Sequence, residues 1–574
     1  MQKYLYILVT CVIIYPKGVM NIMKNKTWWH DKVAYQIYPR SFMDSNGDGI
    51  GDINGIISKL DYLKDLGVEI VWLSPVYRSP MDDGGYDISD YYDIDPIFGK
   101  KEDMDKLLEE ANKRGIKILM DLVINHCSDE HEWFQKALAD PNCEEADYFW
   151  FRESENGPPN NWRSMFGGSV WENVGGNRYY MHLFSKKQPD LNWENPVLRQ
   201  KLYDMINYWL DKGLGGFRID AITHIKKDPT LKSYPVDADG MAGCFAPTRN
   251  FPGIGEYLTD LRKNTFDKYE CVTVAEAAGV PFGDLGAYIN AEDGYFDTMF
   301  DFSYSEPYAY GNGWHDCYRP GEWDFAAWRD TLYMSQTETE KIGFGAVFIE
   351  NHDYPRSIDK FIPDASRSVR SQKMLGNMYF FMRGIPFIYQ GQELGMTNTR
   401  MEKIEDYDDI STKNHYRVAL RDGLTPEEAL HGVSRYSRDN ARVPFPWTTG
   451  ENGGFTTGTP WLKCHPDYKE FAAEELMKDE NSMYHWYKNM IRIRSEYKDI
   501  LVEGSFAPID FGVEKSVCYS RTSEKGKMVS INSFTPELTE YACGEGKVIN
   551  GDGIKSYENG VLTLEPFGCA LILL

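Results

Sequence analysis

Acidic side chains stand at the ends of several short apolar runs in this 574-residue chain. In "GGFRID", Arg218 and Asp220 lie two residues apart, so they share one face of an extended chain. The run "CVTVAE" ends at Glu276, and "FIENHD" ends at Asp353. Charged groups rarely enter a protein interior unless they are paired or take part in chemistry. The pattern therefore predicts a site that combines three carboxylates with an arginine.

Two carboxylates on either side of a bond can hydrolyse a glycoside, provided that one is ionised and the other is protonated. Their surroundings must then push the two pKa values apart. Arg218 favours the ionised form of Asp220, which we expect to be the nucleophile. Glu276 ends an apolar run, where desolvation would keep its proton, so we expect it to be the general acid/base. For Asp353 the residues alone indicate only stabilisation of positive charge.

A fourth set of polar residues, at the end of "IKILMDLVINH", consists of Asp121, Asn125 and His126. A single strand-end aspartate is usually a helix cap, and a single histidine is usually structural. The four sets indicate one functional site only if their strands end at a common opening. The elements that carry them must therefore bring these ends to one place.

Eight apolar runs alternate with helical patterns over the first two thirds of the chain. They lie at residues 33–39, 68–75, 116–126, 215–220, 271–276, 296–302, 343–353 and 385–391. The runs are continuous rather than alternating, as expected for parallel strands that are covered on both faces. We predict an α/β fold, a (β/α)8 TIM barrel whose active site lies at the carboxyl ends of the strands.

The chain is too long for a single core. We predict that the catalytic barrel takes residues 23–126 and 196–505. The stretch 127–195 is rich in Trp, Asn, Gly and Pro and is too long for a plain loop, so we expect an inserted subdomain after the third strand. Short strands separated by turns at 506–574 predict a C-terminal antiparallel β-sandwich domain.

The net charge limits the kinds of partner that the protein could bind, and the cysteine spacing indicates its redox compartment. The net charge, 62 − 87 = −25, argues against nucleic acid and against an anionic membrane surface. The ten cysteines form no close pairs, which indicates buried thiols in a reducing compartment rather than a disulfide framework or zinc site. We expect a monomer that acts on neutral small molecules.

The first 22 residues contain the apolar stretch "YLYILVTCVIIYP", which is too short to span a bilayer. One interpretation is a mis-assigned start codon, with translation beginning at Met23. The other is the core of a signal peptide, although no cleavage pattern follows it. We expect a cytoplasmic protein, or a secreted one if residues 1–22 act as a signal.

The strand ends also resemble the signature regions of glycoside hydrolase family 13, the α-amylase family, over essentially the whole chain. "DLVINH", "GFRIDAITH", "AEAAG" and "FIENHD" match its four regions in order. The resemblance implies that Asp220 is the nucleophile, Glu276 the acid/base and Asp353 the stabiliser of the transition state. It implies retention of the α configuration, with the two working carboxylates about 5–5.5 Å apart. The implied supporting residues are His126, Arg218 and His352.

The stretch "QPDLNWENP" resembles the fifth region of the oligo-1,6-glucosidase branch of this family. The branch includes α-glucosidases, trehalose-6-phosphate hydrolases and sucrose isomerases. In it, the residues that match Asp83, Tyr86 and Arg442 hold the non-reducing glucose, which implies exo action on short oligosaccharides or disaccharides. Around Arg442, "RDNARVPFPW" departs from the more usual "RDNARTPMQW".

Ala221, directly after the expected nucleophile, bears on linkage preference. In this branch the position tends to be Val in α-1,6-specific enzymes and Ala or Thr in α-1,4-preferring ones. We therefore expect α-1,4 linkages to be favoured, with oligo-1,6-glucosidase activity as the alternative. A sucrose isomerase or transglucosylase is a further alternative, but "YPRSIDKF" after Asp353 lacks an arginine-rich pattern. We identify no phosphate-binding cluster of the kind that trehalose-6-phosphate hydrolysis needs.

The loop "DSNGDGIGD" resembles the first half of a calcium loop. It is not an EF-hand, because Gly55 stands at the twelfth position. The branch carries a similar loop that binds Ca²⁺ or Mg²⁺, so we expect a structural ion here and no organic cofactor. An Asp/Gly-rich turn without an ion is the alternative. The candidate ligands are Asp44, Asn46, Asp48, the Ile50 carbonyl and Asp52.

Overall fold

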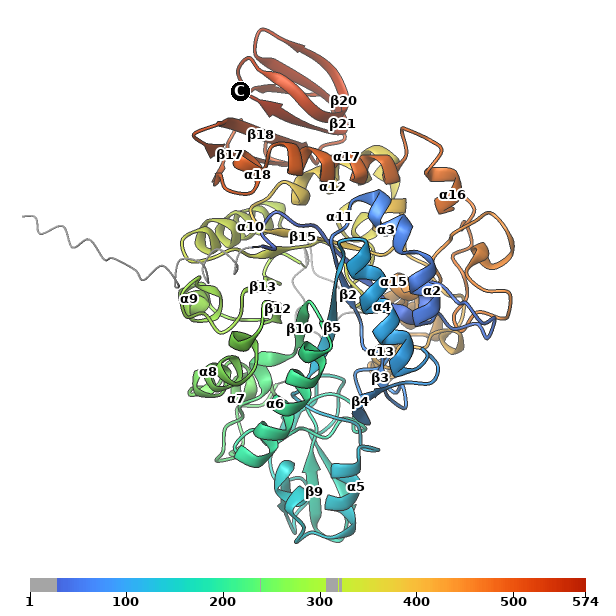
Figure 1. Ribbon diagram of the computed structural model, residues 1–574, viewed down its shortest axis with the longest axis vertical. Coiled ribbons are helices and arrows are strands. Elements are labelled where there is room, and N and C mark those ends of the chain that lie inside the picture. Colours follow the sequence, from blue (N-terminus) through green and yellow to red (C-terminus); the bar gives the residue numbers. More distant parts are fainter. Residues whose placement is uncertain (1–27, 238, 306–317, 319–322) are drawn as a thin grey trace, which may run out of the picture.

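The computed structural model describes residues 28–574, apart from 238, 306–317 and 319–322. The interpretations of residues 1–22 lie outside this range. A barrel occupies the middle of the molecule, a sheet domain lies at one end and a small group of strands lies at the other (Figure 1). Among the described residues, no helix is long and apolar enough to cross a membrane. The eight cysteines in this range are free thiols.

Eight parallel strands close into the predicted barrel, in the order β1-β15-β14-β13-β12-β10-β5-β2. Each lies within one of the eight apolar runs, so the predicted fold class is confirmed. The strands are β1 (Ala34–Ile37), β2 (Ile70–Leu73), β5 (Lys117–Val123), β10 (Gly216–Asp220), β12 (Val272–Glu276), β13 (Thr298–Phe300), β14 (Ala346–Val347) and β15 (Ile385–Tyr389).

The alternation of side chains along β10 explains why its two charged residues point the same way. Phe217 and Ile219 pack in the apolar layer between strands and helices. Arg218 and Asp220 take the opposite face, toward the barrel interior, because successive side chains of a strand alternate. Below Arg218 the interior is filled by aromatic rings, and its guanidinium lies 5.0 Å from the ring centre of Trp72.

The glycine that opens β10 allows this strand to approach β12 closely. Gly216 has φ +143°, and a Cβ placed there would lie 1.9 Å from the carbonyl oxygen of Val272. Only glycine fits such a backbone and such an approach. Gly216 thereby fixes the register in which Ile219 pairs with Ala275, one residue before the two strand-end carboxylates.

Helices surround the barrel, as the alternating pattern predicted (Figure 1). They are α2 (Ile53–Ser58), α3 (Leu60–Leu66), α4 (Lys101–Lys113), α6 (Pro196–Asp211), α8 (Ile254–Asn264), α9 (Leu285–Ile289), α10 (Phe325–Glu340), α12 (Val369–Phe380) and α17 (Met483–Glu496).

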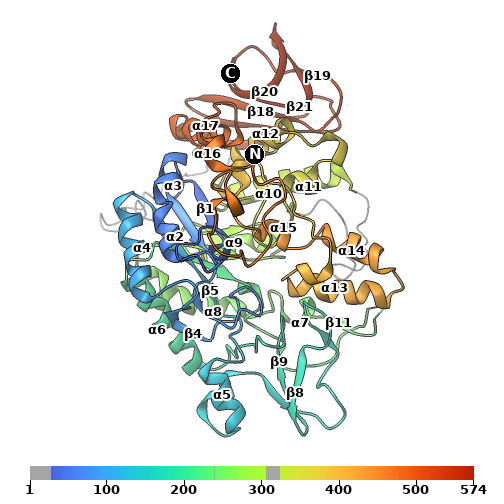
Figure 2. The same ribbon diagram turned by 90° about the vertical axis from the view of Figure 1, so that its right-hand side faces the viewer.

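The chain between β5 and α6 forms small strands beside the carboxyl end of the barrel. It holds α5 (Glu132–Ala139), β6 (Phe151–Glu153), β7 (Trp162–Arg163), β8 (Trp171–Gly175) and β9 (Arg178–Met181). Strands β6, β9 and β8 form one antiparallel sheet, whereas β7 pairs with β11 (Ala242–Gly243), which follows β10. Helices α13 (Ile410–Arg421) and α14 (Pro426–Ser434) lie on the same side of the molecule as β11 (Figure 2).

The C-terminal strands are antiparallel, as predicted, but they pair into one sheet, whereas a β-sandwich was expected. They are β16 (Ser505–Pro508), β17 (Ser516–Ser523), β18 (Gly526–Ser533), β19 (Thr539–Ala542), β20 (Lys547–Glu558) and β21 (Val561–Leu573). All six are hydrogen-bonded into one sheet, in which β21 pairs with β18, β19 and β20.

Candidate active site

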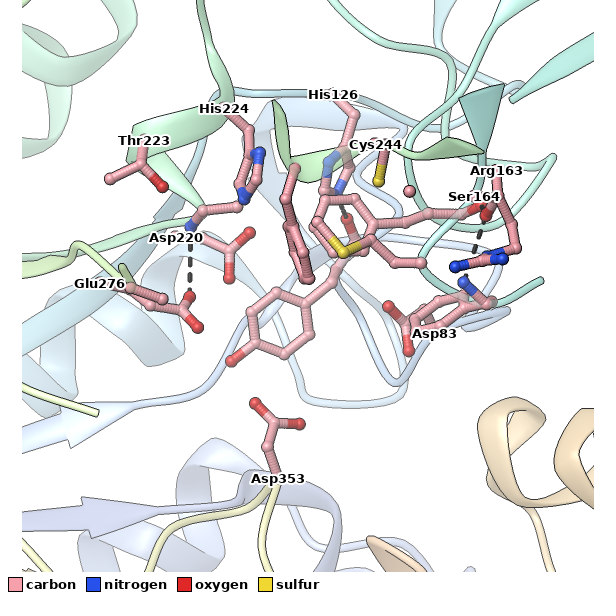
Figure 3. Close-up of a pocket in the computed structure, with 18 of the residues that line it drawn as sticks. Asp83, His126, Arg163, Ser164, Asp220, Thr223, His224, Cys244, Glu276 and Asp353 are labelled. Atoms are coloured by element: carbon pink, nitrogen blue, oxygen red, sulfur yellow. Dashed lines mark hydrogen bonds between the residues drawn. The ribbon is translucent and has the colours of Figure 1, made fainter. Parts of the chain in front are cut away.

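A cavity of about 740 Å³ opens at the carboxyl ends of the strands, and the three predicted carboxylates line it. Asp220 ends β10, Glu276 ends β12, and Asp353 follows β14. Asp220 and Glu276 lie next to each other, and Asp353 lies on another side of the pocket (Figure 3). Of the other predicted site residues, Asp83, Tyr86 and His126 also line the cavity.

Arg218 lies behind the pocket and contacts three carboxylates, two of which line the cavity. Its Nη1 is 2.8 Å from Asp121 Oδ1 and 2.8 Å from Asp220 Oδ1, and its Nη2 donates to Glu276 Oε2. The arginine is only 2% exposed. One buried positive charge is therefore shared by three carboxylates, which makes it a common support rather than a partner of Asp220 alone.

The two carboxylates expected to do the chemistry come from neighbouring strands. Ile219 pairs with Ala275, so Asp220 and Glu276 follow side by side on strands about 4.8 Å apart. The backbone N–H of Ala221 donates to Glu276 Oε2 over 3.1 Å. This juxtaposition suits the short separation of a retaining glycosidase better than the wide one of an inverting enzyme.

Burial sets the protonation of this pair. It raises the pKa of Glu276 to about 8 and that of Asp220 to about 7, against the opposing effect of Arg218 on both. From the sequence we expected Arg218 to keep Asp220 ionised. Arg218 does lower the pKa of Asp220, as expected, but burial outweighs this effect. Glu276 still has the higher pKa of the two, as a general acid requires.

Asp353 has the opposite electrostatic surroundings. Burial would raise its pKa, but the Nε2–H of His352 and the charges of Arg442 and Arg438 outweigh burial and hold the pKa well below its usual range. Arg442 Nη2 lies 2.9 Å from Asp353 Oδ1, and Arg438 Nη1 lies 3.4 Å from the same oxygen. Asp353 is therefore a fixed negative charge at the pocket surface.

His352 is held in one tautomer by its neighbours. Gln36 donates to His352 Nδ1 over 2.8 Å, so the ring proton belongs on Nε2. This Nε2 lies 2.7 Å from the hydroxyl of Tyr86 and 3.1 Å from Asp353 Oδ2. Burial lowers the pKa of His352 to about 3, so the ring is a neutral donor that orients both residues.

The sequence interpretation grouped Arg442 with Asp83 and Tyr86 as residues that hold the glucose, but the arginine that pairs with Asp83 is Arg438. Arg438 lines the cavity, and its Nη2 lies 3.0 Å from Asp83 Oδ1 and 2.7 Å from Asp409 Oδ1. Arg442 reaches Asp353 and the carbonyl of His352 from behind. Both arginines belong to the stretch "SRDNAR", and no local signal indicates which of them faces the pocket.

Several lining residues were not predicted. They are Arg163, Ser164, Phe166, His224, Tyr234, Cys244 and Phe245. His224 Nδ1 donates to Thr248 Oγ1 over 2.9 Å, because that hydroxyl itself donates to the carbonyl of Cys244. His224 therefore retains Nε2 as its acceptor. The motif "GFRIDAITH" contains this histidine, but its spacing alone did not separate it from a structural residue.

The predicted cation loop is closed by its own hydrogen bonds. Asp44 accepts from the backbone N–H groups of Asn46, Gly47 and Gly49. Asp52 accepts from Gly55 and caps α2. Among the described residues, no three or more His, Cys, Asp or Glu side chains form a group that could hold a metal ion. The expected ligand set includes an amide and a carbonyl, so binding of Ca²⁺ or Mg²⁺ stays a prediction.

Comparison with known proteins shows which family the chain belongs to. Residues 36–504 match the family model described as "Alpha amylase, catalytic domain". An oligo-1,6-glucosidase from Parageobacillus thermoglucosidasius is 44% identical over 94% of this chain and 98% of its own. A trehalose-6-phosphate hydrolase from Bacillus subtilis (strain 168) is 40% identical over 88% of this chain and 90% of its own. A crystal structure of isomaltulose synthase from Erwinia rhapontici NX5 superposes with a TM-score of 0.88 at 36% identity, covering 95% of this chain and 99% of that one.

Proposed function

We propose that this chain, which belongs to the α-amylase family of glycoside hydrolases, is a retaining exo-acting α-glucosidase. It would release glucose from the non-reducing end of short α-glucosides. The observation that carries this proposal is the convergence of Asp220, Glu276 and Asp353 on one pocket that also contains the Asp83–Arg438 ion pair.

The reaction would proceed in two balanced steps. Asp220 attacks the anomeric carbon while Glu276 gives its proton to the departing oxygen, so the glycosidic bond breaks as the glucosyl–aspartate ester forms. Glu276, now a carboxylate, takes a proton from water, whose oxygen attacks the same carbon and releases Asp220. Two inversions leave the product in the α configuration. Asp353 stabilises the positive charge that develops on the sugar ring.

The Asp83–Arg438 pair supports exo action. Gln188 donates to Asp83 Oδ2 over 3.1 Å, and Asp83 stands with Tyr86 and His126 in the lining. Such a charged set offers hydrogen bonds to the hydroxyl groups of a terminal glucose. Because the pair fixes two lining residues from distant segments, we expect it to block a chain that continues beyond that glucose.

The residue after the nucleophile supports α-1,4 preference. Ala221 lines the cavity and has a left-handed backbone, with φ +43°. A β-branched side chain is strained in that conformation and would crowd the aglycone. One such group changes selectivity by about 1–3 kcal/mol. We therefore expect maltose-type substrates to be cleaved fastest.

Oligo-1,6-glucosidase activity is the second candidate, because several of the relatives carry that name. A phosphorylated disaccharide fits less well. The lining contains five carboxylates, Asp83, Asp220, Asp237, Glu276 and Asp353, against two arginines, Arg163 and Arg438, and both arginines are already paired. A phosphate would meet no unpaired cationic side chain among the described lining residues.

Proton NMR of maltose, isomaltose, sucrose, trehalose and trehalose 6-phosphate with the purified enzyme tests the proposal. The expected result is fastest cleavage of maltose, with α-glucose appearing before mutarotation. Faster cleavage of isomaltose would replace the linkage assignment, and β-glucose as first product would overturn the retaining mechanism. Formation of isomaltulose or trehalulose from sucrose would favour an isomerase.

A further inference from the structure

The leaving group of the proposed reaction must lie on the Glu276 side of the cavity. Glu276 protonates the departing oxygen, so the sugar that carries this oxygen has to lie within reach of that carboxyl. In Figure 3, Thr223 lies on the same side as Glu276, whereas Asp83 lies on the opposite side. Thr223 lines the cavity, as does Ala278, which follows Glu276 by two residues. Thr223 and Ala278 therefore mark the leaving-group side.

The segment around Arg249 packs against this side of the cavity. The backbone N–H of Asn250 donates to the carbonyl of Thr223 over 2.8 Å. His224, which also lines the cavity, donates from Nδ1 to Thr248 Oγ1 over 2.9 Å. These two bonds hold the residues before and after Arg249, so the backbone of Arg249 is fixed beside the leaving-group side.

The guanidinium of Arg249 contacts two parts of the cavity rim. Its Cζ is 4.4 Å from the ring centre of Phe245, a lining residue that is 43% exposed. It also lies against Gly279, where an added Cβ would be 2.6 Å from the same carbon. Gly279 directly follows Ala278, so the guanidinium reaches the loop that carries Glu276.

No carboxylate of the described residues pairs with Arg249, in contrast to Arg163 and Arg438 of the lining. Within the same described part of the chain, its guanidinium donates no hydrogen bond. Arg249 is nonetheless partly buried, and burial lowers its pKa without an acidic group to offset this effect. Burying a charged donor costs free energy unless its hydrogen bonds are used. The unused donors at the rim therefore indicate a ligand that carries hydrogen-bond acceptors.

We propose that Arg249 is a specificity-determining residue that donates hydrogen bonds to the hydroxyl oxygens of the leaving sugar. The inference rests on the proposed α-glucosidase function and concerns the leaving-group side of the same pocket. A guanidinium presents several donors in a rigid plane, so it can bind neighbouring hydroxyl groups of one sugar together. A substrate whose leaving group is a simple alcohol offers no such hydroxyl groups and gains nothing from Arg249.

The experiment compares maltose with methyl α-glucoside for Arg249→Met, measured by glucose release. Both substrates need the proton of Glu276, but only maltose presents sugar hydroxyl groups to Arg249. For maltose, kcat/KM should fall about tenfold or more, because hydrogen bonds from a charged group are lost. For methyl α-glucoside, kcat/KM should stay within about twofold of wild type, since its leaving group makes none of these bonds. Arg249→Lys should recover part of the loss on maltose, because an ammonium keeps the charge without the planar fork.

The pH profile and a second arginine provide controls. The alkaline limb near pH 8 should be unchanged in Arg249→Met, because the pKa of Glu276 is set by burial, Arg218 and the neighbouring carboxylates. Arg152→Met is the matched variant. Arg152 also lies over an aromatic ring, with its Cζ 5.7 Å from the ring centre of Trp150, but it is outside the lining. It should change the cleavage of neither substrate.

Equal losses on both substrates would mean that Arg249 acts through the loop of Glu276, and no loss on maltose would mean that it binds no sugar. Either result would overturn the proposal. If Arg249→Met does not fold, Arg249→Gln decides by the same split between substrates. If the wild type prefers isomaltose, isomaltose replaces maltose in the comparison. A wild-type enzyme that cleaves none of these glucosides would instead contradict the proposed function.

Discussion

Arg218 contacts more residues of the site than its spacing from Asp220 suggests. It touches Asp121, Asp220 and Glu276 together, so its charge lowers all three pKa values without separating them. Burial raises the pKa of both Glu276 and Asp220 against this effect. Asp353 differs because Arg438 and Arg442 add positive charge that the other carboxylates lack. These surroundings assign protonated and ionised forms to different residues of one pocket.

The pKa of Glu276 predicts the alkaline limb of the rate profile. Burial raises this pKa to about 8, so the protonated acid is lost, and kcat/KM for maltose falls, as pH rises through about 8. Glu276→Gln should abolish maltose cleavage. It should retain glucosyl–enzyme formation from 2,4-dinitrophenyl α-glucoside, whose leaving group needs no proton, and this step should show no alkaline limb. Stopped-flow release of dinitrophenol measures it, and a limb that persists near pH 8 in the variant would exclude Glu276 as its source.

Arg438 should matter for glucose binding because its removal leaves buried carboxylates unpaired. Truncating one partner of a buried charge pair costs about 2–5 kcal/mol. Arg438→Met should therefore lower kcat/KM for α-glucosyl fluoride by about 100-fold or more, measured by fluoride release. Arg435→Met, three residues earlier and outside the lining, is the matched control. A loss of similar size in both variants would mean that the whole segment, not the Asp83 pair, is responsible.

At the scale of elements, the strand ends bring the three carboxylates to one pocket. The apolar runs predicted all eight strands, because strands covered on both faces carry an uninterrupted hydrophobic signal. The same signal placed Asp220, Glu276 and the segment of Asp353 at one opening of the barrel. The strands themselves are shorter than the runs, since β14 covers only Ala346–Val347. Polar residues such as Glu350 and Asp353 then belong to the loop that follows.

Gly216 tests how tightly β10 is fixed against β12. Gly216→Ala should lower the free energy of unfolding by about 3 kcal/mol or more, because a Cβ would collide with the Val272 carbonyl in a left-handed backbone. Gly283→Ala is the control, since a Cβ there has no atom within 4 Å. Urea unfolding measures both variants. A Gly216→Ala protein as stable as the Gly283→Ala protein would contradict this close approach.

The loops could not be predicted in the same way. The hydrogen bonds from Asn160 and Trp162 to the backbone of residues 231 and 232 join segments about 70 positions apart, and no periodicity marks either side. The choice between Arg438 and Arg442 depends on how a short helix, α15 (Asp439–Arg442), turns beneath the pocket. Such placements follow from tertiary packing, so residue spacing did not reveal them.

At the scale of the whole molecule, the 44–52 loop joins distant parts of the chain. Asp44 accepts a bond from Thr456, and the carbonyl of Gly49 accepts one from the backbone of Trp461. The guanidinium of Arg40 lies 3.8 Å from the Trp461 ring centre. A cation in this loop would therefore stabilise the contact between the first strand's loop and a segment more than 400 positions later.

Metal removal should consequently affect stability more than chemistry. If Ca²⁺ or Mg²⁺ binds the loop, excess EDTA should lower Tm by a few degrees, consistent with a binding free energy of about 2–3 kcal/mol. The value of kcat at 25 °C should stay unchanged. Asp48→Ala should show the lower Tm with or without EDTA. Equal Tm values for wild type in EDTA, Ca²⁺ and Mg²⁺ would mean that hydrogen bonds alone close the loop.

The covalent role of Asp220 is the central claim, and direct labelling tests it. The enzyme would be incubated with 5-fluoro-α-glucosyl fluoride, which forms the glucosyl–enzyme faster than water removes it, and then digested for mass spectrometry. The account predicts one fluoroglucosyl group on the peptide that contains Asp220, and none on the Asp220→Asn variant, which should fold normally but not turn over. A label on Glu276 or Asp353, or full activity of Asp220→Asn, would contradict the mechanism.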